Sequence, residues 1–62
     1  MNERLLRIQT VTELTGLSRA TVYRLLERRE FPVPLRISER AVAWRASEVQ
    51  EWIESRRRTT ER

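Results

Sequence analysis

Apolar residues recur at helical spacing in three stretches of the chain. Positions three or four apart lie on one face of an α-helix, so each stretch predicts a short amphipathic helix. The first runs from about Val11 to Thr15, the second from Arg19 to about Arg29, and the third lies within residues 46–58. The apolar positions on which these helices rest are Val11 and Leu14, then Val22, Leu25 and Leu26, then Val49, Trp52 and Ile53.

Polar residues mark the start of each predicted helix. Thr10, Ser18 and Ser47 each stand where a side-chain oxygen can accept a hydrogen bond from a free backbone N–H group of the first turn. Glu13 follows Thr10 by three residues, and Gln50 follows Ser47 by three, which is the spacing of a capping box. The sequence therefore predicts three capped helices.

The segment between the first two helices is very short. Gly16 can adopt the left-handed backbone that ends a helix, and Ser18 already begins the next one. Leu17, between them, is expected to fill the angle between the two helices. Two short helices joined by a tight turn containing glycine indicate a helix-turn-helix.

The chain leaves helical patterning at the segment "FPVP", where two prolines disfavour both helix and a central strand. Two alternating stretches follow, "LRIS" and "AVAW", and the residues "SERA" between them can form a turn. This pattern predicts a two-stranded hairpin, and "LLRI" near the N-terminus is expected to be extended. The residues expected to point inward are Leu35, Ile37, Val42 and Trp44, with Arg36, Ser38, Ala43 and Arg45 outward.

The predicted fold class is mainly α with a small β-hairpin, in the order helix-turn-helix-wing-helix. We expect one domain over residues 1–62, with an ordered part of about 5–57 and a polar C-terminal tail. A chain of 62 residues buries only about 60% of its unfolded surface, so the core must be small. Most of that core is expected to come from Leu17, Val22, Leu25, Leu26, Phe31, Ile37, Trp44 and Trp52.

The amino-acid composition excludes several kinds of functional site. The chain has no cysteine, histidine or aspartate, which excludes a disulfide, a Cys/His zinc site and a Ser/His/Asp or Cys/His catalytic group. We therefore expect no enzyme activity, no metal and no cofactor. No apolar run approaches the roughly 20 residues that cross a bilayer, and the N-terminus lacks a secretory pattern, so we expect a cytoplasmic protein without a membrane partner.

The charge is basic and comes from one residue type. Thirteen arginines and no lysine stand against nine glutamates, for a net charge of +4. The arginine fork of donors matches phosphate groups and guanine edges, which indicates nucleic acid as a partner. Codon usage of the source genome explains the absence of lysine equally well, but not the positions of the arginines.

The second predicted helix carries most of the candidate contacts, because its outward side is rich in arginine. In a major groove, its first residues would meet base edges, and Ala20 would allow close approach or touch a thymine methyl. A solvated amphipathic helix with charge pairs is the alternative. The hairpin arginines have two interpretations. Either they are placed to contact phosphates or a minor groove, or they belong to an ordinary exposed loop. The candidate DNA-contacting residues are Ser18, Arg19, Ala20, Thr21, Tyr23, Arg24, Arg28, Arg36 and Arg40.

Three segments, "TGLSRATVYRL", "FPVPLRIS" and "AVAWRASEVQEWI", together resemble the AlpA family of phage and prophage transcriptional regulators. The resemblance covers about Leu5 to Arg56 and implies a winged helix-turn-helix related to the MerR and excisionase-like domains. It also implies sequence-specific duplex binding. The segment "ERREF" departs from relatives that carry a glycine there, which affects the exit from the second helix. The implied DNA-reading residues are Ser18, Arg19, Thr21, Tyr23 and Arg24, with Arg36 and Arg40 on the wing.

Three functional hypotheses follow. The leading one is a transcriptional regulator of a phage or mobile element that binds double-stranded DNA with its second helix in the major groove. RNA polymerase or an integrase would then be a further partner, and self-association would be weak or induced by DNA. The second is an excisionase, or recombination directionality factor, that bends DNA. The third is a protein-interaction module whose basic face binds an acidic partner.

Overall fold

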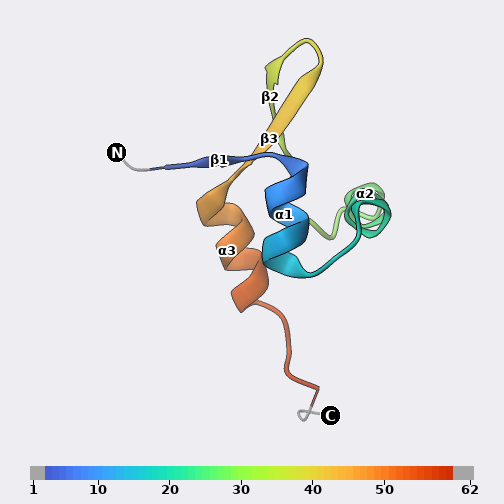
Figure 1. The fold of residues 1–62 in the computed structure, drawn as a ribbon. Coiled ribbons are helices and arrows are strands. Elements are labelled where there is room, and N and C mark those ends of the chain that lie inside the picture. The colour runs from blue at the N-terminus through green and yellow to red at the C-terminus, as the bar shows by residue number, and fades with distance from the viewer. Residues whose placement is uncertain (1–2, 60–62) are drawn as a thin grey trace.

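The computed structural model describes residues 3–59 and shows three helices and a small antiparallel sheet (Figure 1). The order is strand, two helices, hairpin and helix, so the expected fold class, a winged helix-turn-helix, is confirmed. The elements are β1 (Leu5–Leu6), α1 (Ile8–Thr15), α2 (Arg19–Glu27), β2 (Leu35–Ser38), β3 (Ala41–Arg45) and α3 (Ala46–Glu54).

Helix α1 begins earlier than the sequence pattern indicated. Its N-cap is Arg7, which makes no side-chain capping bond, and Thr10 lies inside the helix. The predicted capping box of Thr10 and Glu13 is therefore wrong. Ile8 explains the earlier start, because it lies three residues before Val11 and packs against the same core.

The turn between α1 and α2 has the expected geometry. Gly16 ends α1 in the left-handed region, with φ 78°, and its N–H donates to the carbonyl of Thr12 at 2.8 Å. The hydroxyl of Thr15 donates to the carbonyl of Val11 at 2.8 Å and accepts the N–H of Leu17 at 3.2 Å. These bonds satisfy backbone groups that a tight turn would otherwise leave unpaired.

Helix α2 begins as predicted and ends two residues sooner. Ser18 caps it, accepting the N–H of Thr21 at 3.1 Å. After Glu27 the chain closes a Schellman motif, in which the N–H groups of Arg29 and Glu30 donate to the carbonyls of Leu26 and Leu25. Arg29 holds φ 60° in this motif, although no glycine is present.

The sheet has the strand order β1-β3-β2 and is antiparallel throughout. The predicted hairpin is confirmed, but its inward and outward residues differ from the prediction. Leu35 pairs with Ala43, on the side opposite Trp44, and Ile37 is an extra residue between the paired Arg36 and Ser38.

The bulge and the strand register explain why the predicted directions of Leu35, Ile37 and Ala43 are wrong. Leu35 and Ile37 are 37% and 45% exposed rather than inward. Ala43, expected outward, is fully buried, because β3 packs against both α1 and α3 in addition to pairing with β2. Val42 is half-buried and Trp44 is fully buried, as their predicted direction requires.

Helix α3 is capped from the other end of the chain. Its N-cap position is Arg45, without a side-chain bond, so the predicted cap at Ser47 is wrong. The Ser47 N–H and hydroxyl instead donate to the carboxylate of Glu3, at 3.1 and 2.8 Å. Gln50 donates to Glu54, at 3.1 Å, rather than closing a capping box.

Fewer of the expected core residues are fully buried than predicted. The core also includes residues that were not among those expected. Of the expected core residues, Leu17, Leu25, Leu26 and Trp52 are partly buried against it. Strand β1 contributes because it pairs with β3 and carries Leu6 inward. The buried apolar residues are Leu6, Val11, Val22, Phe31, Ala43, Trp44 and Val49.

Two features relevant to function are absent from residues 3–59. None of their helices has the length and apolar content needed to cross a membrane. No group of three or more acidic, cysteine or histidine side chains in this range is arranged to hold a metal ion. The end of the predicted polar tail, residues 60–62, lies outside the described part.

Candidate nucleic-acid interface

Helix α2 presents a free outer side. In Figure 1, α2 and α3 lie on opposite sides of α1, so the last helix does not cover the outer side of α2. Val22 is fully buried, whereas Tyr23 is 42% exposed and therefore not packed away against α1. The exposed candidate residues of this segment are Ser18, Arg19, Ala20, Tyr23, Arg24 and Arg28, and Thr21 is half-buried.

The hydrogen bonds at the start of α2 engage the Ser18 hydroxyl more fully than the Thr21 hydroxyl. The Ser18 oxygen accepts the N–H of Thr21, and its hydroxyl donates to the Thr21 Oγ1 at 2.9 Å. A serine hydroxyl has one hydrogen, so Ser18 has none left for a phosphate. The Thr21 hydroxyl hydrogen is therefore the better placed of the two, and Ser18 acts mainly by ordering the helix start.

Helical spacing groups the outer residues into one face. Tyr23 and Arg24 lie three and four positions after Ala20, and Arg28 continues the row one turn after Arg24. Arg19 lies at the edge of this face. We define the outer face of α2 as Ala20, Tyr23, Arg24, Glu27 and Arg28, all of which are exposed.

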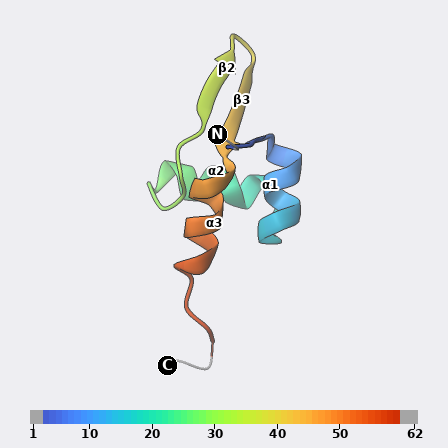
Figure 2. The same ribbon diagram turned by 90° about the vertical axis from the view of Figure 1, so that its left-hand side faces the viewer.

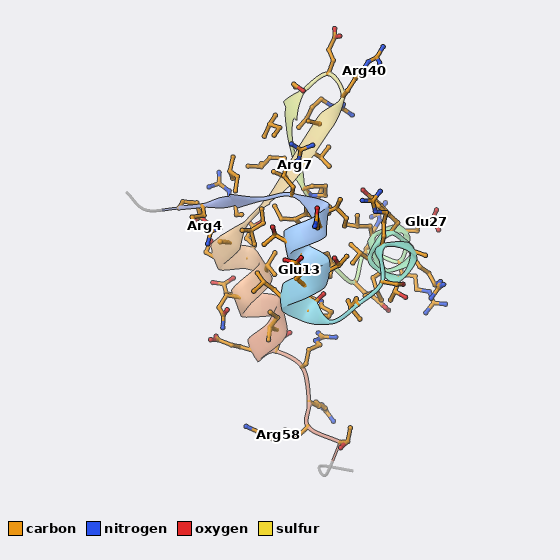
Figure 3. The ribbon with its side chains drawn as sticks, viewed as in Figure 1. Arg4, Arg7, Glu13, Glu27, Arg40 and Arg58 are labelled. Atoms are coloured by element: carbon orange, nitrogen blue, oxygen red, sulfur yellow. The ribbon has the colours of Figure 1, made fainter. Side chains whose placement is uncertain are left out.

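Glu27 belongs to this face and the sequence analysis missed it. It lies seven positions after Ala20, almost two helical turns, and three after Arg24. Figure 3 shows its side chain on the side of α2 away from α1. The same helical spacing that selected Arg24 would have selected Glu27, but the expected contacts were basic, hydroxyl and small apolar side chains, and no carboxylate.

The hairpin projects beyond the rest of the molecule in both ribbon views (Figures 1 and 2). Arg40 lies at its tip and points away from the body (Figure 3). Arg36 donates from Nη1 to the carbonyl of Glu39 at 3.0 Å, so it stabilises the turn. Of the two candidate wing residues, Arg40 is the one whose side chain is extended into solvent.

Two tryptophans hold the linker between α2 and the hairpin. Trp44 donates from Nε1 to the carbonyl of Pro32, and Trp52 donates to the carbonyl of Glu30, both at 2.8 Å. Phe31 packs edge-on against both rings, with centroid distances of 6.3 and 4.8 Å. The two indoles therefore fix the orientation of α2 relative to the hairpin rather than serving as stacking platforms for bases.

The basic tail begins with a residue that is already engaged. The Arg56 guanidinium lies 4.5 Å from the centre of the Trp52 ring and hydrogen-bonds to Ser55. Arg57 and Arg58 are exposed beyond the end of α3, and Arg58 lies far from the hairpin in Figure 3. The tail therefore adds positive charge at the end of the molecule opposite the wing.

Charge is divided unevenly between the two outer helices. Residues 19–29 contain four arginines and one glutamate, a net charge of +3. Helix α3 contains three glutamates and no basic residue, a net charge of −3. In Figure 1 these two helices lie apart, and α2 is the more basic of the two, although Arg45 precedes α3 and Arg56 follows its end.

Hydrogen bonding displaces the pKa of the Glu3 carboxylate. The hydrogen bonds from the Ser47 backbone N–H and hydroxyl hold the pKa of Glu3 below its ordinary value. Desolvation raises the pKa against these bonds, and the Arg45 charge lowers it by a smaller amount. Glu3 lies at the start of α3, away from α2, and its role is to stabilise that helix.

The hairpin, the tight turn and the capped α2 define a winged helix-turn-helix protein. Residues 4–57 match the family described as Prophage CP4-57 regulatory protein (AlpA). The chain belongs to the AlpA family, as the sequence resemblance indicated, and the family is one of phage-associated regulatory proteins.

The chain is also similar to a protein of Enterobacteria phage P4. It is 44% identical over 54 residues to "Uncharacterized protein ORF88", across 87% of this chain. The matched region spans 61% of that relative's length. No solved structure matches the chain.

Proposed function

We propose that this protein is a sequence-specific, double-stranded DNA-binding regulator of a phage or mobile element, with the outer face of α2 in the major groove. The observation that carries the proposal is the exposure of this face on a helix whose start is capped by Ser18. An α-helix with its side chains is about 10–12 Å across, which fits the roughly 12 Å width of the major groove.

Roles for the individual residues follow from their positions. Arg24 is central on the outer face and is proposed to read a guanine edge, where its fork can donate two hydrogen bonds. Arg19 lies at the edge of this face and Arg28 at its C-terminal end, and both are proposed to contact phosphates, as is the Thr21 hydroxyl. Arg40 would bind the backbone or the minor groove beside the α2 site.

The chain offers one recognition helix, so one copy would cover about one half-site. Useful affinity is then expected to need two or more copies on the same DNA, through weak or DNA-induced self-association. RNA polymerase and an integrase are the proposed further partners. A regulator of this kind would act in the cytoplasm, at the nucleoid.

A second candidate function is DNA bending during recombination, as in an excisionase. The projecting hairpin favours it, because a wing that holds the backbone beside a bound helix can support a bend. Gel shifts with circularly permuted duplexes would reveal a bend by mobility that depends on the position of the site. Uniform mobility at every position would rule this candidate out.

The proposal is tested by selecting bound sites from a random duplex pool with the full chain, then repeating the selection with Arg24→Ala. We expect a defined motif for the wild type. The variant should lose preference at one base pair, at a cost of about 1–3 kcal/mol, because a base-reading contact is removed.

Arg19→Ala is the comparison variant, since it removes the same charge at the edge of the face. Arg19→Ala should lower the affinity for all duplexes alike if Arg19 contacts phosphate. If the chain binds no duplex at low salt but binds an acidic protein, the proposal is wrong. That result would support a protein-interaction module instead.

A further inference from the structure

The outer face of α2 contains one acidic residue among basic and apolar ones. Glu27 is exposed, lies one turn after Tyr23 and Arg24 on this face, and points away from α1 (Figure 3). The proposed function would place this carboxylate in a groove walled by phosphates. Phosphate contact explains the arginines of the face but not a glutamate at this position.

A carboxylate accepts hydrogen bonds and donates none, so only a donor on the DNA can compensate for the water it loses. The major groove presents amino-group donors on base edges, and a glutamate characteristically accepts from N4 of cytosine. The phosphates offer no donor, and the minor groove offers only the N2 amino group of guanine, which a helix in the major groove cannot reach. The acidic charge would also penalise every duplex in which that donor is missing.

Placement along α2 makes this contact compatible with the one proposed for Arg24. Residues three apart differ by about 4.5 Å along a helix axis, so Arg24 and Glu27 would meet base pairs one or two steps apart. Arginine matches guanine and glutamate matches cytosine, so the two residues together define two positions of the site.

We propose that Glu27 is a specificity-determining residue that accepts a hydrogen bond from the N4 amino group of a cytosine in the bound site. The proposal rests on the proposed function, because it requires α2 in the major groove. Glu27 contributes discrimination rather than affinity. Its charge weakens non-specific binding and favours sites that carry cytosine at the matching position.

Site selection with Glu27→Gln tests the proposal, alongside the wild type and Glu30→Gln. Glutamine presents an acceptor and a donor, the pattern that pairs with adenine N6 and N7, so the preferred base at one position should change from cytosine to adenine. The preference for cytosine over the other bases should fall by about 5–150-fold, which corresponds to about 1–3 kcal/mol per contact. Glu30→Gln removes the same charge just outside α2 and should leave the motif unchanged.

Three results are distinguishable. A changed base at one position with Glu27→Gln alone supports the proposal. An unchanged motif, or an equal rise in affinity for all duplexes with both variants, overturns it and makes Glu27 a surface charge only. A wild type that selects no motif overturns the proposed function itself, whereas a wild-type motif that survives Glu27→Gln overturns this inference alone. Circular dichroism of each variant verifies that it is folded.

Discussion

At the scale of single residues, the longest-range hydrogen bonds described join the N-terminal segment to the start of α3. Glu3 accepts two hydrogen bonds from Ser47, 44 positions later, and the carbonyl of Arg4 accepts the N–H of Ala46. A negative charge at the start of a helix also interacts favourably with the helix dipole. The N-terminal segment thus supplies the cap that α3 lacks locally.

This cap makes stability depend on pH. The folded-state pKa of Glu3 is lowered from its ordinary value of 4.5. Its contribution to the free energy of unfolding is therefore fully present above about pH 4.5 and is lost as the pH falls through the lower, folded-state pKa. Urea unfolding of wild type and Glu3→Gln should show a difference in stability at pH 7 that disappears in acid.

Glu13→Gln is the control, because Glu13 is exposed on α1 and the substitution removes the same charge. Its stability at pH 7 should stay closer to the wild type than that of Glu3→Gln, because Glu13 does not cap a helix. A stability difference for Glu3→Gln that stays constant from pH 7 into acid would contradict the role assigned to Glu3.

Sequence reasoning located some residues and not others, for identifiable reasons. Ser18 and Gly16 were predicted correctly because cap and turn chemistry act over two or three neighbouring residues. The Glu3 cap was not predictable in this way, since its partner is distant in sequence. Ile37 was misplaced because alternation predicts direction only until a bulge adds a residue.

At the scale of elements, the end of α2 is the strained part of the fold. Arg29 adopts φ 60° in the Schellman motif, a conformation that costs a residue with a side chain about 1–2 kcal/mol. The orientation of the hairpin depends on this exit, because the linker held by the two tryptophans follows immediately. The absence of glycine in "ERREF" therefore has a structural cost and leaves the fold intact.

Arg29→Gly should stabilise the protein by about 0.5–1 kcal/mol, since the relief of strain exceeds the added freedom of the unfolded chain. Chemical denaturation at neutral pH measures the change. Arg28→Gly removes the same charge at φ −88°, where glycine has no advantage, and should destabilise. Loss of stability with Arg29→Gly would show that the left-handed residue is not strained.

The elements themselves were largely predictable, whereas their contacts were not. Helical spacing at Val22, Leu25 and Leu26 predicted α2, and alternation around the turn predicted the hairpin. The pairing of β1 with β3 needed the three-dimensional fold, because a two-residue strand carries no periodicity of its own. The free outer face of α2 could be anticipated from spacing, but not the position of α3 on the far side of α1.

At the scale of the whole molecule, the long axis runs from the hairpin to the C-terminal tail, whereas the net charges of α2 and α3 differ across it. The hairpin and the C-terminal tail extend the molecule to 42 Å along its longest axis, and α2 carries net positive charge whereas α3 carries net negative charge. An acidic α3 turned away from DNA would favour one orientation of the protein on the duplex.

The wing contact is tested by salt dependence. Arg40→Ala should reduce the slope of log affinity against log salt by about 1, because one phosphate contact is lost, and should leave the selected motif unchanged. Arg4→Ala is the matched control, since Arg4 lies at the side of the molecule away from α2 in Figure 3. Equal changes in slope for the two variants would indicate that Arg40 contributes only general charge.

The central claim is that the outer face of α2 enters the duplex, and NMR titration of the 62-residue chain with its selected duplex tests it most directly. Backbone amide shifts report which segments meet the DNA. If α2 lies in the major groove, the largest changes fall over residues 18–28, with smaller ones at the hairpin tip and little change over α3. Largest changes over Ala46–Glu54, with α2 unperturbed, would contradict it.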